Sequence, residues 1–339
     1  MQNEITESCE LVNEHGGLSL SGWARALYPR YSRSKLKASG LRIKEWDYYE
    51  IINPEYGIVL LIYDVGYQAR AIVKWIDFKT GNIVEDGLTL WFTRGSMNLP
   101  SSSDSGDIHF EKDGVLWECL RGKDRTFRFR FPDFPTGALE GEICLTQPPN
   151  QDTIVNVIPF KNKKQFVYAQ KINCMRPSGH VTIAGKKFHF NKENRSTGCL
   201  DWSRAVFPYH VQWRWCTVSG WVNDVPFGLN IDYGFGSESN KSMIFYNDRG
   251  HHLNKPRFSF SENNPMDDWL FHDDEGRVDL RLKPMFLEDS NTNLIIIRMK
   301  VVKAYGYFTG SVILDDGTEI LIKEDDRLFG SAEAVVNHW

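Results

Sequence analysis

Hydrophobic and polar side chains alternate along much of the chain. Phe127, Phe129 and Phe131 alternate with Arg128 and Arg130, so one face of this segment is aromatic and the other is cationic. A period of two places successive side chains on opposite faces of a β-strand. The pattern therefore predicts strands with one face in a core and the other against water or a polar cavity. Residues 69–75 and 278–283 repeat it.

Turn dipeptides separate these alternating segments. Glycine beside Asn or Asp tolerates the positive φ that tight hairpin turns need, and such pairs stand at 81–82, 86–87, 113–114 and 316–317. No segment predicts a helix of three turns or more, and short helices are expected only at residues 34–39 and 331–338. Strands with hairpin spacing and almost no crossover helices predict an all-β, antiparallel fold that is closed or stacked.

The length of 339 residues fits about two domains of ordinary size. A break in the alternating pattern at residues 175–195 favours a boundary there, which gives units 1–175 and 176–339. With 40 Lys and Arg against 44 Asp and Glu, the net charge is −4. This balance does not favour nucleic-acid binding or electrostatic adsorption on a membrane. The unusual quantity is the aromatic content of 13%, with 11 Trp, 13 Tyr and 21 Phe.

Several classes of protein lack support in the sequence. The six cysteines form no CxxC pair, and no HxH, HExxH or phosphate-binding glycine loop is present, so neither a metal nor another cofactor is expected. No apolar run approaches the roughly 18 residues of a membrane helix, and the polar N-terminus does not resemble a secretory signal. The expectation is a cytoplasmic protein with free thiols and no stable membrane insertion.

The densest aromatic segment is DWSRAVFPYHVQWRW at residues 201–215. Trp213 and Trp215 are two positions apart, so on a strand they share a face. Asp201 and Arg204 are close enough in sequence to suggest a charge-assisted pair. One interpretation is structural, with Trp side chains filling a barrel end. The other is a stacking surface for an apolar or ring-shaped ligand, with polar groups that orient or protonate it.

Two further segments combine aromatic and polar residues. In residues 44–51, Trp46 and Tyr48 share one face, which fits either an edge strand or a ligand-lining wall. In residues 228–240, Asn230 and Asp232 project to one side of a predicted strand. Polar side chains in an apolar interior are costly unless they are paired, which makes these two better candidates than surface carboxylates.

These motifs resemble a bacterial family of unknown function that is related to carotenoid hydratase and tocopherol cyclase and shares their lipocalin-like architecture. The resemblance spans roughly residues 20–339. The chain departs from the family pattern at Ala205, where Gly is usual, and at Lys241, where Glu is expected. The motifs that carry the resemblance lie at 44–51, 168–175, 199–215, 228–236, 276–280 and 330–339.

The resemblance implies two consecutive antiparallel lipocalin-like (calycin-type) β barrels. It also implies acid chemistry in an apolar barrel, in which a carboxylic acid protonates an alkene and aromatic walls stabilise the cation. Asp201 or Asp232 would be the acid, with Arg204 beside them. The candidate ligand-binding residues are Trp46, Tyr48, Trp202, Tyr209, Trp213, Trp215 and Asn230.

Three hypotheses about function follow. The leading one is a protein that binds a small hydrophobic molecule, isoprenoid-, lipid- or aromatic-like, with or without cofactor-free hydration, cyclisation or isomerisation. The second is a carbohydrate-binding or carbohydrate-active β protein, because Trp and Tyr also stack on sugars; a hydrolase would need two facing carboxylates. The third is a non-catalytic interaction module. The sequence determines neither the ligand nor the oligomeric state.

Overall fold

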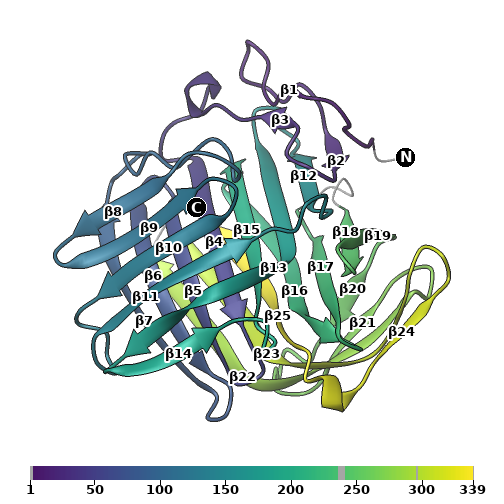
Figure 1. Ribbon diagram of the computed structural model, residues 1–339. Helices are drawn as coiled ribbons and strands as arrows, with labels where there is room; N and C mark the ends of the chain where they lie inside the picture. The colour runs from purple at the N-terminus through teal and green to yellow at the C-terminus, as the bar shows by residue number, and fades with distance from the viewer. Residues whose placement is uncertain (1–2, 236–240, 295–296, 339) are drawn as a thin grey trace.

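The computed structural model describes residues 3–235, 241–294 and 297–338. Gly236 and Trp339, which belong to motifs of the family resemblance, lie outside the described residues. Within them the chain forms two large antiparallel sheets and a small parallel pair of strands, so the all-β prediction is confirmed. Each large sheet curls into a half-barrel, and Figure 1 shows the first in purple to teal and the second in green to yellow.

The first sheet has 13 strands, and its main path runs β7-β6-β5-β4-β15-β13-β11-β10-β9-β8. The small pair is β1 (Cys9–Glu10) with β3 (Pro29–Arg30). The strands of the first sheet are β2 (Gly22–Ala24), β4 (Ile43–Ile52), β5 (Tyr56–Asp64), β6 (Gln68–Asp77), β7 (Asn82–Trp91), β8 (Ile108–Lys112), β9 (Val115–Arg121), β10 (Arg125–Phe131), β11 (Leu139–Thr146), β12 (Ile154–Pro159), β13 (Phe166–Ile183), β14 (Lys186–Phe190) and β15 (Thr197–Val206).

The second sheet has 10 strands, and its main path runs β19-β18-β17-β16-β25-β23-β22-β21-β20. The strands are β16 (His210–Val222), β17 (Val225–Tyr233), β18 (Ser242–Tyr246), β19 (Arg249–Leu253), β20 (Arg257–Ser259), β21 (Trp269–His272), β22 (Val278–Leu294), β23 (Ile297–Ile313), β24 (Glu319–Ile322) and β25 (Phe329–His338).

The helical content of the described chain is limited to two single 3-10 turns, Arg33–Lys35 and Glu324–Asp326. The expected helix at 331–338 is wrong, because these residues belong to β25, which pairs with β16 on one side and β23 on the other. The chain passes from the first sheet to the second between Val206 and His210. The assignment of domains 1–175 and 176–339 stays a prediction, and β13 runs through this predicted boundary.

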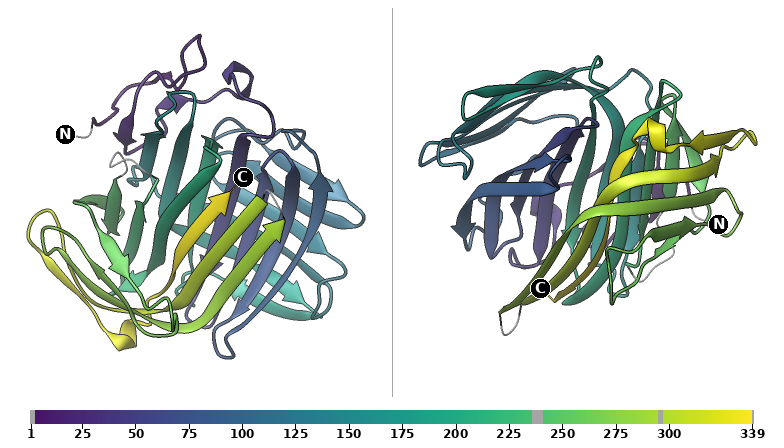
Figure 2. Two further views of the ribbon diagram at one scale, coloured as in Figure 1. Left: turned by 180° about the vertical axis from the view of Figure 1, so that it is seen from behind. Right: turned by 90° about the horizontal axis from the view of Figure 1, so that it is seen from below.

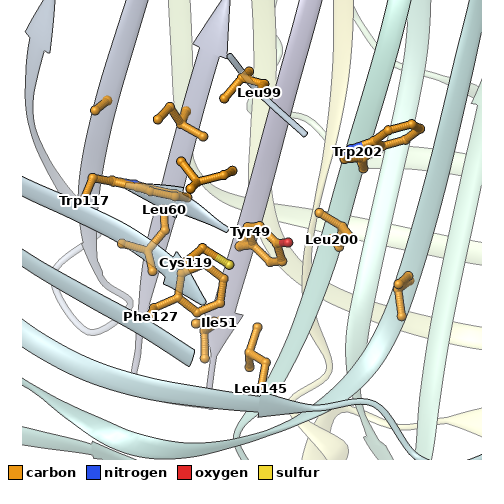
Figure 3. Packing of buried hydrophobic residues seen from close by; sticks show 14 of the residues in the cluster. Tyr49, Ile51, Leu60, Leu99, Trp117, Cys119, Phe127, Leu145, Leu200 and Trp202 are labelled. Atoms are coloured by element: carbon orange, nitrogen blue, oxygen red, sulfur yellow. The ribbon is translucent and has the colours of Figure 1, made fainter. Parts of the chain in front are cut away.

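Alternation explains the inner core of the first half-barrel. Figure 3 shows Trp117, Phe127, Tyr49 and Leu200 pointing into the same interior from four different strands. In the second half-barrel, apolar side chains of β16, β17, β22 and β23 fill the equivalent space. Each interior is thus built from every second residue of its strands, as a period of two requires.

The central strands bury both of their faces. Every residue of β15 is buried, because one face looks into the first half-barrel and the other meets the second sheet. The two curled sheets pack against each other along these strands (Figure 2). We call the side chains between them the inter-sheet layer. They come from β4, β5, β6, β13 and β15 on one side and from β16, β17, β22, β23 and β25 on the other.

A bulge in β13 forms a close contact between the two sheets. The register shifts between Ile172 and Met175, and Cys174 has a φ of 61°. The side-chain amide of Asn173 thereby donates to the carbonyl of Val218, at 2.9 Å. The backbones approach so closely that a Cβ at Gly228 would lie 2.8 Å from Cβ of Asn173. Glycine at this position therefore permits the contact between the sheets.

Candidate functional site

The candidate site residues predicted from the sequence divide among three places. Two lie in the inner core of the first half-barrel, namely Trp202 and Arg204. Tyr209 lies at the surface with 46% of its area exposed. The remaining seven lie in the inter-sheet layer: Trp46, Tyr48, Asp201, Trp213, Trp215, Asn230 and Asp232.

The inter-sheet layer contains a buried ion pair. Lys171 of β13 and Asp201 of β15 are cross-strand partners, and their side-chain atoms Nζ and Oδ1 lie 2.6 Å apart. The hydroxyl of Ser203 donates to the same carboxylate at 3.1 Å. The Lys171 ammonium also lies 4.7 Å from the ring centroid of Trp215, a cation–π distance. The second sheet thus contributes an aromatic face to a charge pair held by the first.

Asp232 is the titratable group most suited to acid chemistry. It lies on β17, 4% exposed, and its backbone N–H is bound by the hydroxyl of Ser242. Burial raises the pKa of Asp232 to about 7; Asp201 and Glu333 also raise it, and Lys171 opposes them. A carboxyl group with a pKa near 7 exists in both protonation states at neutral pH, which a general acid requires.

A small cavity joins these groups. Its volume is about 20 Å³, which is room for one water molecule. Titratable groups of both sheets and the hydroxyl of Ser203 line it together with aromatic rings. The lining residues are Trp46, Val167, Ala169, Lys171, Asp201, Ser203, Trp213, Trp215, Asp232 and Phe235.

Near-parallel rings form one wall of the layer. The Trp213 and Phe235 centroids lie 5.9 Å apart with planes inclined by 13°, and those of Trp213 and Phe207 lie 6.2 Å apart at 9°. Trp46 is stacked on Phe207 at 6.1 Å and 11°. The prediction that Trp213 and Trp215 share a face is confirmed, since both line the cavity. These faces supply apolar area and π-electron density beside the acid.

A second group of charges continues from the cavity along the layer. Tyr48 donates to Glu50 at 2.7 Å and accepts from the Lys303 ammonium at 3.2 Å. Lys303 lies 3.8 Å from Glu333, which also accepts the indole N–H of Trp213 at 3.0 Å. Burial raises the pKa of Glu50, while Lys303 and Tyr48 lower it. A network of hydrogen bonds and one ion pair therefore leads from the aromatic wall to a buried carboxyl.

Sequence reasoning missed Lys171, Lys303 and Glu333. Lys171 had a usable signal, because a lysine within the apolar strand segment 166–175 needs a buried partner. Lys303 and Glu333 had none, because they come from strands whose pairing depends on the tertiary fold. Asn230 and Asp232 share a face as predicted, but that face meets the first sheet instead of a barrel interior.

The suggested pair between Asp201 and Arg204 is wrong. Positions three apart on a strand point to opposite faces, and Arg204 points into the first half-barrel. There its guanidinium lies 2.9 Å from the carboxylate of Asp47, and Arg121 binds the second oxygen of Asp47. Trp202 shares this inner face, with the Arg204 guanidinium 4.5 Å from its ring centroid. Arg204 is thus separated from the inter-sheet cavity by its own strand.

Tyr209 does not join the other candidates. Its ring lies 5.7 Å from that of His338 and 5.9 Å from the Arg42 guanidinium. The described residues bring no three His, Cys, Asp or Glu side chains together in a way that could hold a metal ion. Over the same residues, no helix has the length and apolarity needed to cross a membrane.

A family model matches nearly the whole of this chain. A model described as "Domain of unknown function (DUF2804)" matches residues 2–339. The chain belongs to this family. No curated protein shows significant similarity to it.

Solved structures resemble the fold of this DUF2804 chain at low sequence identity. A protein assigned as AttH from Nitrosomonas europaea has a TM-score of 0.51 at 13% identity, over 88% of this chain and 93% of that one. Kievitone hydratase from Nectria haematococca has a TM-score of 0.43 at 11% identity, over 87% of this chain and 88% of that one. CghA has a TM-score of 0.47 at 8% identity, over 99% of this chain and 97% of that one. The AttH likeness shows that the tandem arrangement of curled sheets occurs in another protein.

Proposed function

We propose that this DUF2804 chain binds a small hydrophobic molecule with an alkene or aromatic ring in the inter-sheet layer, and that Asp232 donates a proton to it. The observation that carries the proposal is the meeting of Asp232, the Lys171–Asp201 pair and three Trp rings at one small cavity. A few convergent polar groups among aromatic walls are typical of ligand sites.

The proposed chemistry balances without a cofactor. In a hydration, the π electrons of the alkene take the Asp232 proton, which forms a C–H bond and leaves a carbocation. Water adds to the cation through a C–O bond, and the proton that it loses restores the Asp232 carboxyl. In an isomerisation, the carboxylate instead removes a proton from a neighbouring carbon. Trp213 and Trp215 would stabilise the cation through their π faces.

The size of the cavity sets a condition on binding. Ligand pockets have volumes of about 300 Å³ or more, whereas this cavity has about 20 Å³. A ligand larger than water therefore needs Trp213, Phe235 or Phe207 to change rotamer. Because the moving rings include a tryptophan, binding should change the intrinsic fluorescence of the chain.

The test begins with native mass spectrometry of the full chain purified from its own host. The proposal expects a retained small hydrophobic molecule, which is then extracted and incubated with fresh protein. Wild type should convert it to a product with the mass of one added or lost water, or to an isomer. Asp232→Asn should bind the molecule and not convert it, because the amide cannot supply the proton.

Two controls make the result specific. Asp273→Asn alters another buried carboxyl, which accepts backbone N–H groups of Arg277 and Val278 in a turn away from the cavity, and it should retain activity. Trp215→Leu should lose the ligand while keeping a cooperative melting transition. Conversion by Asp232→Asn at the wild-type rate, retention of a glycan, or a chain without any small molecule would each overturn the proposal.

A further inference from the structure

Three loops lie together at one end of the first sheet. The strand registers bring the start of β4, the turn between β5 and β6 and the end of β7 to this end. A Cβ at Gly66 would lie 2.7 Å from Cα of Leu41, and the backbone N–H of Phe92 donates to the carbonyl of Tyr67 at 2.8 Å. The loops before β4, between β5 and β6 and after β7 are therefore packed side by side.

Large apolar side chains at this end are exposed. Phe92 is 70% exposed, Trp91 at the end of β7 is 61% exposed, and Leu41 before β4 is 39% exposed. The fully buried Asp64 fixes the loop after β7 by accepting the hydroxyl of Thr93 at 2.8 Å. Within this loop Phe92 has a φ of 54°, which is unfavourable for a bulky residue. The fold thus holds two aromatic rings in water, and large apolar side chains exposed together are typical of an interaction site.

Positive charge gathers on the same loops. The whole chain has a net charge of −4, so a local excess of cations does not follow from its composition. The segments 31–44, 65–68 and 91–99 contain no Asp or Glu. Their basic residues are Arg33, Lys35, Lys37, Arg42, Lys44 and Arg94.

Two of these cations lack a counter-charge beside the exposed rings. Glu45 and Glu10 each pair with one of the others, namely Arg33 and Lys35. Asp107 lines a groove with the third segment, and its carboxylate accepts a backbone N–H at 2.8 Å. Arg42 and Arg94 form no ion pair among the described residues. Their positive charge is therefore available to an anionic partner.

We infer that this end of the first sheet docks on the surface of a lipid bilayer that contains anionic lipids. We call it the docking rim, and its residues are Leu41, Arg42, Trp91, Phe92 and Arg94. The apolar side chains enter the interfacial region of the bilayer, and the guanidinium groups meet the anionic headgroups. A second copy of this chain is a poorer partner, because a symmetric contact would bring the cations of two rims together.

The test is sedimentation of the full chain with lipid vesicles. Vesicles of phosphatidylcholine alone are compared with vesicles in which about one-third of the lipid is phosphatidylserine. The chain should bind the anionic vesicles at least tenfold more tightly. Raising the salt from about 0.1 M to about 1 M shortens the Debye length from about 10 Å to about 3 Å, and it should remove most of this preference.

One pair of double variants tests the apolar contribution. Trp91→Ser/Phe92→Ser removes both rings and should weaken binding to anionic vesicles at least tenfold. Leu270→Ser/Leu321→Ser is the matched control, because it removes two apolar side chains of the second sheet that are 49% and 51% exposed. The control should bind as wild type.

A second pair tests the charge contribution. Arg42→Gln/Arg94→Gln should lose most of the preference for anionic vesicles. Arg128→Gln/Arg130→Gln changes the net charge equally on the exposed face of β10 and should keep the preference. Melting temperatures close to that of wild type show that each variant is folded.

The inference does not depend on the chemistry proposed for Asp232, and Asp232→Asn should bind vesicles as wild type. Absence of vesicle binding, equal affinity for both kinds of vesicle, or wild-type affinity in Trp91→Ser/Phe92→Ser would overturn it. A wild-type dimer in analytical ultracentrifugation that this double variant abolishes would also overturn it, because a second copy would then cover the rings.

Discussion

The two faces of β16, β17 and β25 differ sharply in chemistry. One face, with Cys216, Ile231 and Ala332, packs into the apolar interior of the second half-barrel. The other face, which presents Asp232 and Glu333 to the first sheet, is charged and aromatic. Burial of the apolar face stabilises the fold. Burial of the charged face costs free energy, which its ion pairs and hydrogen bonds must offset. The polar groups at this face are paired with one another, as in the contacts of Lys171 with Asp201 and of Lys303 with Glu333.

The largest effect is expected from breaking the buried ion pair. Lys171→Met leaves the Asp201 carboxylate buried with only the hydroxyl of Ser203 and should lower the free energy of unfolding by about 3–5 kcal/mol. The double variant Lys171→Met/Asp201→Leu removes both charges and should recover most of this loss. Urea denaturation of the three proteins measures it. A Lys171→Met chain within about 1 kcal/mol of wild type would show that the layer is hydrated and not a dry interface.

The second effect is a pH dependence. The pKa of Asp232 is about 7 in the folded chain, above its usual 3.8, so the folded state binds this proton more tightly than the unfolded state. The resulting stability is present below about pH 4 and is lost as the pH rises through about 7. Relative to Asp232→Asn, wild type should therefore lose about 2–4 kcal/mol of unfolding free energy between pH 4.5 and pH 8.

Other titrations do not obscure this comparison. Burial lowers the pKa of His252 to about 4, which gives a stability change of opposite sign as the pH falls below its usual 6.5. It occurs in both proteins and cancels in their difference. A constant difference between wild type and Asp232→Asn across this pH range would mean that Asp232 is ionised throughout.

A smaller effect tests the link between the aromatic wall and the charges. Trp213→Phe retains a ring but removes the N–H that Glu333 accepts at 3.0 Å. The loss should be about 1–2 kcal/mol, since a buried hydrogen bond to a charged group disappears. Comparing the melting temperatures of Trp213→Phe and Trp213→Leu separates the contribution of the hydrogen bond to stability from that of the ring. An equal melting temperature for wild type and Trp213→Phe would contradict the network.

The smallest effect is expected on the apolar face. Ile231 is fully buried and adjacent to Asp232 in sequence, but it points into the second half-barrel. Ile231→Val should cost about 1 kcal/mol, the value for one deleted methylene group in a core. This cost should not vary with pH. A pH-dependent cost would show that the two faces of β17 do not act independently.

The sequence predicted which residues share a face better than it predicted what that face contacts. The pairs Trp213/Trp215 and Asn230/Asp232 do share faces, because alternation follows from strand geometry alone. Whether that face meets a barrel interior or another sheet depends on tertiary packing, and here both faces of the central strands are buried. Arg204 and Trp202 were grouped with Asp201 because they are neighbours in sequence, although alternation places them on the other face.

The error at residues 331–338 has a similar origin. Ala332, Glu333 and Ala334 favour a helix locally, but the segment completes the second sheet between β16 and β23. The gain from two full ladders and from burial of both faces outweighs a local preference of a few tenths of a kcal/mol per residue. Glu333, which takes part in the inter-sheet network, was hidden by that interpretation.

The proposed chemistry requires Asp232 to be protonatable near neutral pH within the inter-sheet layer. The most direct test is an NMR titration of the full chain with ¹³C-labelled aspartate carboxyl groups, in which the Asp232 signal is assigned by its absence from Asp232→Asn. We predict a midpoint near pH 7 for that signal. A midpoint near the usual value of 3.8 would contradict it.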